Sequence, residues 1–135
     1  PEVDLLQSIP GVGPVYAALI AVEIGDIGRF RDSNHLASYA GVAPRKEESG
    51  TSVQKRRKRK GGNRRLKNAL MQSSQRSVQC DPVARAYYER KRAEGKKHLQ
   101  ALRALARHRV TVIFAMLNEG TFYEPPVEVD ENGCG

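Results

Sequence analysis

A serine followed by a dense run of cations is the feature of this sequence best suited to chemistry. Ser49-Gly50 precedes a stretch in which nine Lys or Arg residues and no acid lie between Thr51 and Lys67. A serine hydroxyl activated by a base or a metal attacks a phosphodiester, and neighbouring cations stabilise the negative charge that develops. A Ser-Gly pair in a loop is more often an ordinary turn. A nucleophilic Ser49 is therefore a hypothesis that spacing alone does not decide.

The cations themselves predict binding to a polyanion. Six are consecutive, and such a run stays mobile until it meets counter-charge. If about six of them neutralise phosphates, affinity should fall with salt at a log–log slope of about −5. A localisation signal or a solvated segment is the alternative, although the run lies between ordered stretches. The candidate phosphate contacts here are Lys55, Arg56, Arg57, Lys58, Arg59 and Lys60.

The start of the next helix predicts a second phosphate contact. Asn63 is a good N-cap, and Arg64 and Arg65 follow it in the first turn. The helix dipole disfavours cations at this end, unless a bound phosphate attracts both the helix end and the guanidinium groups. We therefore predict nucleic-acid contacts from the residues around this helix start: Gly62, Asn63, Arg64, Arg65 and Lys67.

A glycine turn near the N-terminus predicts a third phosphate contact. In Ile9-Pro10-Gly11-Val12-Gly13-Pro14, two glycines separated by one residue allow positive φ, so that successive N–H groups point outward. The following helix adds its own free N–H groups and the positive end of its dipole. Such contacts hold phosphate without reading sequence. The predicted contacts are Gly11, Val12 and Gly13, and a tight connector between two helices is the alternative.

Composition narrows the class of protein. The 135 residues, 39% of them hydrophobic, suit one globular domain. No apolar run reaches the roughly 18 residues of a membrane span and no signal peptide is present, so we expect a cytoplasmic, nucleoid-associated protein without membrane contact. The formal net charge is +8, and residues 119–135 contain five acids and no Lys or Arg. Residues 1–118 therefore carry 23 basic and 10 acidic residues, a net charge of +13 that favours a polyanionic partner.

The hydrophobic pattern predicts an all-α fold: a compact multi-helix domain over residues 1–118. We expect helices at about 2–8, 14–24, 63–79, 82–94 and 96–118, and one capped by Asp32 or Ser33. Residues 45–62 show neither period and are interpreted as a basic loop, and 119–135 as a disordered acidic tail. The helix over 14–24 should bury a stripe of Val15, Leu19 and Val22. The stripes expected on the later helices are Leu66, Leu70, Ser73 and Ser77, then Leu102, Ala106, Val110, Ile113 and Leu117.

Two family resemblances rest on these residues. The stretch LLQSIPGVGPVYAALIAVEIG (about 5–24) resembles the helix–hairpin–helix motif of DNA repair and junction-binding proteins. Together with Ala-Gly-Val-Ala-Pro at 40–44, Ser49-Gly50 and Gly-Asn-Arg-Arg-Leu at 62–66, it resembles the C-terminal domain of Piv/MooV-type insertion-sequence transposases. The resemblance covers about residues 5–118.

The resemblance implies that two domains contribute to the reaction. Family members join an N-terminal RuvC-like domain, whose DEDD acidic quartet holds a divalent metal such as magnesium, to a C-terminal domain with a nucleophilic serine. The family's serine falls on Ser49, although Thr51 and Ser52 are close enough for another register. It implies DNA as partner, a structured guide (bridge) RNA, and a homo-oligomeric intact protein. This sequence shows no acidic quartet, so we expect no cofactor in this chain and no strand cleavage by it alone.

Other residues and functions remain open. His35, His98 and His108 lack partners at metal-ligand spacing, so we predict no metal site in this chain. Tyr87 and Tyr88 could stack on bases, but we expect one to pack in the core and the other at the surface. The alternatives to a serine-bearing transposase domain are a non-catalytic helix–hairpin–helix module that binds DNA through its phosphates, and an RNA-binding scaffold.

Overall fold

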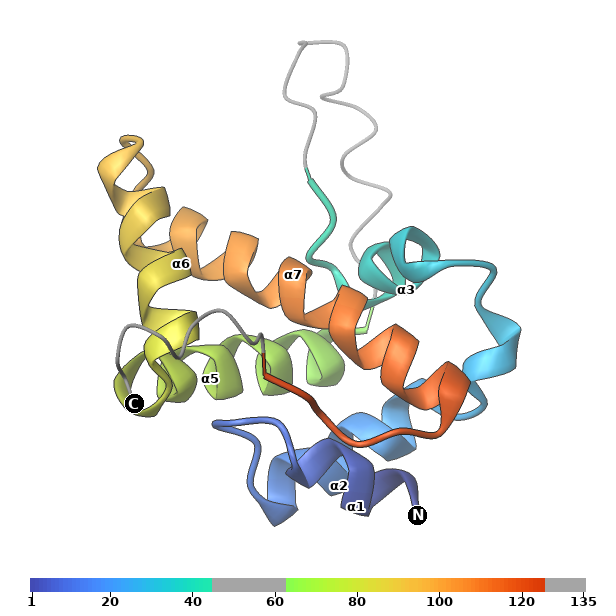
Figure 1. The fold of residues 1–135 in the computed structure, drawn as a ribbon. Coiled ribbons are helices and arrows are strands. Elements are labelled where there is room, and N and C mark those ends of the chain that lie inside the picture. The colour runs from blue at the N-terminus through green and yellow to red at the C-terminus, as the bar shows by residue number, and fades with distance from the viewer. Residues whose placement is uncertain (45–62, 126–135) are drawn as a thin grey trace, which may run out of the picture.

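The computed structural model describes residues 1–44 and 63–125, and this part of the chain is entirely helical (Figure 1). It contains six α-helices and a short 3₁₀ helix, with no β-strand in the described ranges, so the predicted all-α fold is confirmed. The elements are α1 (Glu2–Gln7), α2 (Pro14–Ile24), η1 (Ile27–Arg29), α3 (Ser33–Ala40), α5 (Arg64–Cys80), α6 (Pro82–Ala93) and α7 (His98–Glu119).

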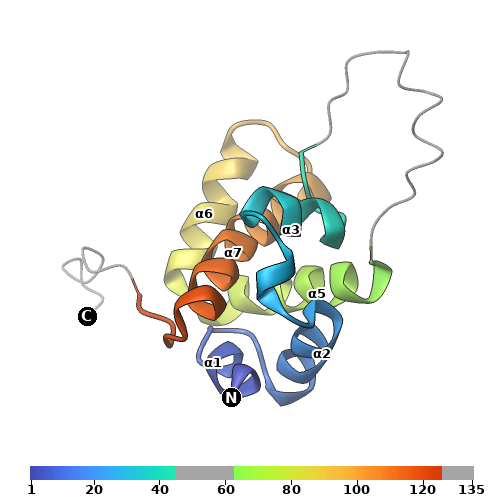
Figure 2. The same cartoon turned by 90° about the vertical axis from the view of Figure 1, so that its right-hand side faces the viewer.

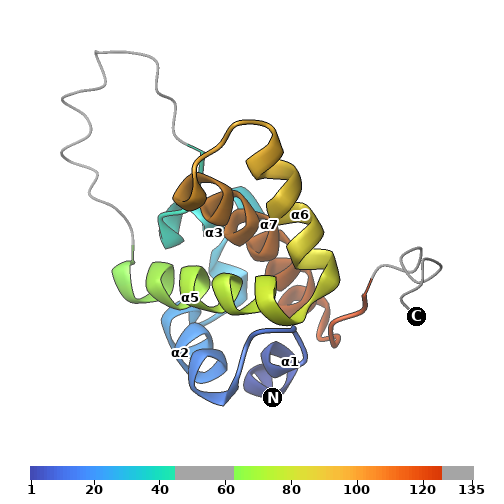
Figure 3. The same cartoon turned by 90° about the vertical axis from the view of Figure 1, so that its left-hand side faces the viewer.

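Helix α5 crosses the middle of the fold and organises the rest. Figure 3 shows α5 between the α1–α2 pair below it and α6 and α7 above it. Helix α2 packs against α5, and α6 and α7 pack against each other as well as against α5. Helix α3 lies against α7 on the other side, as Figure 2 shows. Helix α5 therefore lies between the two N-terminal helices and the two C-terminal helices (Figure 3).

Side-chain caps explain where several helices begin. The carboxylate of Asp32 accepts from the N–H of His35, and that of Asp81 accepts from the N–H of Val83. The Asn63 side-chain oxygen accepts from the N–H of Leu66 at 2.9 Å. Each cap satisfies an N–H that has no partner within its own helix. The predicted cap at Asn63 is confirmed, and of the two candidates for α3 the structure selects Asp32.

The core confirms most of the expected stripes. Leu66 and Leu70 of α5 are buried, as are Leu102, Ala106, Val110 and Ile113 of α7, while Leu117 is partly buried. Ser73 and Ser77 are buried too, in line with the sequence pattern. The β-branched segment of α7 is helical because its apolar residues continue the period of the helix.

The stripe predicted on α2 is wrong at two of its three positions, since only Leu19 packs against the core. The side chains of Val15 and Val22 are 75% and 74% exposed, and α2 instead buries Ala17, Ile20 and Ile24. Ten of its eleven residues, all except Glu23, are apolar or aromatic, so the helix is apolar on nearly every side. Periodicity then cannot select the buried face, and contact with α5 selects it.

The chain beyond α7 packs back onto the N-terminal turn. Gly120 ends α7 in the left-handed conformation, and the Tyr123 N–H then donates to the Ser8 hydroxyl at 2.8 Å. The tail is described as far as Pro125, and residues 126–135 lie outside the described part. In the described part of the chain, none of the helices is both long and apolar enough to span a bilayer.

Candidate nucleic-acid interface

The glycine turn lies against the C-terminal half of α5. Gly11 has φ +90°, and a Cβ at this position would lie 2.7 Å from the backbone oxygen of Ser73 and 2.9 Å from the Ser77 Cβ. Serines at these buried positions leave room for the turn to approach the helix backbone. Glycine is therefore required at position 11 both by its conformation and by close packing.

The other two predicted contacts of this turn differ from Gly11. Val12 is buried, and its N–H already donates to the oxygen of Ile9 at 3.0 Å, so this residue serves packing. Gly13 has φ −85°, which other residues adopt readily, and a Cβ there would meet nothing within 4 Å. Of the two glycines, only Gly11 adopts positive φ. The fold thus provides a reason for glycine at position 11 and none at position 13.

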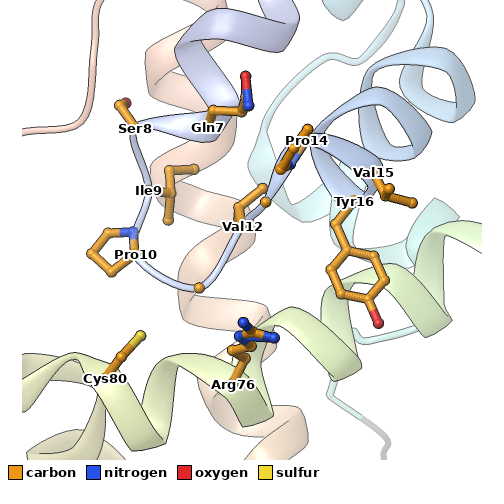
Figure 4. Close-up of a pocket in the computed structure, with 12 residues that line it drawn as sticks. Gln7, Ser8, Ile9, Pro10, Val12, Pro14, Val15, Tyr16, Arg76 and Cys80 are labelled. Atoms are coloured by element: carbon orange, nitrogen blue, oxygen red, sulfur yellow. The ribbon is translucent and has the colours of Figure 1, made fainter.

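An open pocket of about 520 Å³ borders the turn (Figure 4). Arg76 and Cys80 of α5 rise toward it from the opposite wall. Gly13 caps α2 without a side-chain acceptor, and Pro14 at the first helical position has no N–H to satisfy. The N–H groups of Val15 and Tyr16, at the second and third helical positions, have no acceptor within the helix. A helix end and a guanidinium thus face one open pocket.

A buried arginine fixes the position of this turn. Arg109 of α7 is only 7% exposed, and its guanidinium donates to the backbone oxygen of Pro10. Burial lowers the pKa of Arg109 from its ordinary value. Sequence reasoning missed this residue. Its burial could have been inferred from its position in α7. Arg109 lies three positions after Ala106 and four before Ile113, on the face of the helix that packs into the core.

The opposite end of α5 forms a second polar cluster, anchored by Asn63. Its amide Nδ2 donates to the Glu23 carboxylate at 2.7 Å and to the Tyr39 hydroxyl at 3.1 Å. Its backbone N–H donates to the Tyr39 carbonyl oxygen at 2.6 Å. Hydrogen bonds from Asn63 and Arg29 lower the pKa of Tyr39. Asn63, predicted as a nucleic-acid contact, is thus fully occupied in joining α5 to α2 and α3.

Cations surround this cluster. Arg64 and Arg65 are exposed in the first turn of α5, and Arg65 pairs with Glu23 at 3.6 Å. Arg103 and Arg107 of α7 donate to the carbonyl oxygens of Gly41 and Val42 at 3.2 and 3.1 Å. Lys67 lies against Gly41 as well. The residues Arg64, Arg65, Lys67, Arg103 and Arg107 are called the cationic corner below.

The cationic corner lies where residues 45–62 leave and rejoin the described fold. Pro44 precedes that segment and Asn63 follows it. Sequence reasoning anticipated the three α5 cations but not Arg103 or Arg107, whose partners are 62 and 65 positions away in the chain. Ser49, Lys55, Arg56, Arg57, Lys58, Arg59, Lys60 and Gly62 lie outside the described residues.

The structure therefore separates the predicted contacts into two sites. The glycine turn between α1 and α2 faces the C-terminal end of α5. The cationic corner surrounds the N-terminal end of α5. Helix α5 has 17 residues. At about 1.5 Å per residue the two sites lie roughly 25 Å apart. In the described ranges, no three His, Cys, Asp or Glu side chains gather closely enough to hold a metal ion.

Comparison with known proteins assigns the family. Residues 3–89 match the sequence profile described as the transposase IS116/IS110/IS902 family. The chain belongs to this transposase family. The matched range includes the glycine turn, the cationic end of α5 and the segment that contains Ser49.

Similar proteins come from several bacteria. The chain is 50% identical over 124 residues to the insertion element IS110 43.6 kDa protein of Streptomyces coelicolor, covering 92% of this chain and 31% of that protein. It is 34% identical over 118 residues to the pilin gene-inverting protein of Moraxella bovis, covering 86% and 37%. It is 29% identical over 121 residues to the IS1111A transposase of Coxiella burnetii, covering 87% and 33%. The chain thus spans about a third of the length of these relatives.

Proposed function

We propose that this chain is the DNA-binding, serine-bearing domain of an insertion-sequence transposase of the Piv/MooV type, and that it acts in DNA transposition and site-specific recombination. The observation that carries the proposal is the convergence at the cationic corner. The segment with Ser49 and six consecutive cations starts and ends beside five further cations on α5 and α7. Positive charge concentrated in this way attracts nucleic acid through its phosphates.

In the proposed reaction the Ser49 hydroxyl attacks a DNA phosphodiester. A bond forms between its Oγ and phosphorus, the bond to one sugar oxygen breaks, and that oxygen leaves with a proton as a hydroxyl group. The cations of residues 55–60 and of the cationic corner would stabilise the charge that develops on the phosphate oxygens.

The glycine turn would act at a distance from this chemistry. Its open pocket, with the first turn of α2 and Arg76, suits a phosphate oxygen, and contacts of this kind hold the backbone without reading bases. This is the role of a helix–hairpin–helix motif, which we propose for α1, α2 and the turn between them. Binding there does not require Ser49, so a non-catalytic module is the alternative function.

The rest of the machinery is proposed to lie elsewhere in the protein. The resemblance implies that magnesium is held by a DEDD quartet in an N-terminal RuvC-like domain, and the described residues contain no such ligand cluster. A structured guide RNA and a homo-oligomeric assembly are further parts of the proposal. The isolated chain would bind nucleic acid without cleaving it.

Replacing Ser49 with Ala in the full-length protein tests the proposal. Recombination of a donor–target pair should fall to background, while affinity for DNA stays within about twofold, because a hydroxyl contributes little to a phosphate grip. Thr51→Val and Ser52→Ala are the matched controls and should keep recombination. If Ser49→Ala retains recombination and one of the two controls loses it, the nucleophile is the residue replaced in that control. Retention in all three would favour the non-catalytic module.

A further inference from the structure

A second cavity lies on the other side of the glycine turn. It has a volume of about 160 Å³ and is bounded by α6, α7 and the segment that follows α7. Ile9 of the turn borders both cavities, and the neighbours Cys80 and Asp81 each face a different one. At roughly 30 Å³ per water molecule, it would hold about five waters. This is room for one planar heterocycle.

Three charged groups border this cavity, the guanidinium of Arg109 and the carboxylates of Asp81 and Glu124, and no ion pair joins them among the described residues. Arg109 is almost fully buried, and its guanidinium donates to the backbone oxygen of Pro10 but to no other acceptor in the described part of the chain. Asp81 is close enough to favour the charged form of Arg109, yet the two form no ion pair among the described residues. A buried cation without a paired carboxylate is costly unless water or a polar ligand in the cavity completes its hydrogen bonds.

The remaining walls are aromatic and apolar. The rings of Tyr87 and His108 stack with centroids 5.1 Å apart, and both line the cavity. Tyr123 borders it from the segment that the Ser8 hydroxyl holds in place. Proteins bind unpaired bases in pockets of this type, between aromatic or apolar side chains with hydrogen bonds to the base edge.

We propose that this cavity binds one unpaired guanine of the nucleic acid whose backbone the glycine turn holds. Guanine presents two neighbouring N–H donors, which a carboxylate such as Asp81 accepts. It also presents two neighbouring acceptors, O6 and N7, which a guanidinium such as Arg109 approaches. The inference rests on the proposed nucleic-acid grip and adds to it a base-reading site. The fold would then combine a sequence-blind contact with a base-specific contact on two sides of one turn.

Short single-stranded oligonucleotides of deoxythymidine, with or without one central deoxyguanosine, test this site by fluorescence anisotropy. We expect the deoxyguanosine to tighten binding by roughly 5- to 100-fold, the range typical of a good bidentate base contact. Equal affinities for the two oligonucleotides would overturn the proposal and leave the phosphate grip intact.

Asp81→Asn separates recognition from folding. Asn is as good an N-cap as Asp, so α6 should keep its cap, while an amide N–H replaces a carboxylate oxygen toward the cavity. The preference for deoxyguanosine should disappear and the affinity for oligothymidine should stay unchanged. Asp32→Asn is the matched control because it makes the same change at the cap of α3, away from the cavity. A preference retained in Asp81→Asn would contradict the assignment.

If neither oligonucleotide binds, the proposed contact of the glycine turn with the phosphate backbone is contradicted. Free nucleosides then test the cavity separately. Guanosine titrated into the chain should shift the backbone amide signals of Val83, Ala84 and Val112 in NMR spectra, and thymidine should not. Shifts with guanosine would support the cavity independently of the grip. Absence of shifts, or equal shifts with both nucleosides, would overturn it.

Discussion

The two ends of α5 carry the same predicted role but are built differently. At the C-terminal end, close packing of Gly11 against α5 and the buried side chains of Val12 and Arg109 shape the glycine turn, whereas Gly13 packs against nothing and borders an open pocket. At the N-terminal end, Asn63 and Arg65 are already engaged by Glu23. Residues that the sequence alone marks equally as candidate contacts therefore fall into two groups. Some fix the shape of the site, and others remain available to contact a ligand.

Gly11→Ala should have the largest effect on stability. The new Cβ would lie 2.7 Å from the Ser73 backbone oxygen and would require a non-glycine residue at φ +90°. Positive φ and overpacking each cost about 1–3 kcal/mol, so we expect a loss of about 3 kcal/mol in the free energy of unfolding. Urea denaturation measures it. Gly13→Ala is the control and should stay within about 0.5 kcal/mol of wild type, and an equal loss in both would contradict the division.

Asn63→Ala should have the next largest effect. It removes a helix cap, worth about 1 kcal/mol, and the hydrogen bonds to Glu23 and Tyr39. We expect a loss of about 2 kcal/mol in thermal or urea unfolding without any nucleic acid present. Asn63→Ser retains a capping oxygen and should lose about half as much. Wild-type stability in Asn63→Ala would contradict the structural role of this residue and leave it available to contact a ligand.

Arg64 and Arg65 should differ in how they affect binding to DNA. Arg64→Ala should reduce the slope of log affinity against log salt by about 0.9, the contribution of one phosphate contact, and leave stability unchanged. Arg65 forms an ion pair with Glu23 at 3.6 Å. Because this pair already neutralises part of its charge, Arg65→Ala should reduce that slope less. Titrations at several salt concentrations measure both slopes. Equal reductions would show that the ion pair with Glu23 does not compete with phosphate.

His108 should give the smallest effect, a dependence of stability on pH. Burial, and then the nearby charges of Arg109 and Arg90, lower the pKa of His108 in the folded chain. The unfolded chain therefore binds the proton more readily, and stability should fall as the pH drops through and below the ordinary histidine pKa of about 6.5. His108→Gln should flatten this dependence on the acidic side of about pH 6.5. His98→Gln is the control, and the same flattening there would contradict the assignment.

The sequence predicted the helices well because their boundaries depend on local chemistry. Asp32 and Asn63 mark helix starts by capping, and the spacing of Leu102, Val110 and Ile113 identifies the buried face of α7. It failed at α2, where nearly every residue is apolar and only contact with α5 selects Ala17, Ile20 and Ile24. It also did not foresee the short helix Ile27–Arg29.

The candidate sites were predicted less completely, because long-range contacts define them. The sequence pointed to the glycine turn and to Arg64, but Arg109 contacts Pro10 across 99 positions, and Arg103 and Arg107 reach Gly41 and Val42. A residue's role at a site depends on which groups the fold has already paired. Local patterns carry no information about that pairing. The role of Ser49 remains a prediction from resemblance, since this residue lies outside the described ranges.

The affinity of Gly13→Leu for two unrelated DNA duplexes shows whether the glycine turn binds DNA through its phosphates alone, because position 13 has open space and ordinary φ. We expect wild-type stability together with a similar loss of affinity, about tenfold, for both duplexes, since a bulky side chain would cover N–H groups that contact only phosphate. Unchanged affinity would show that the turn is a simple connector. A loss confined to one duplex would contradict a sequence-blind grip.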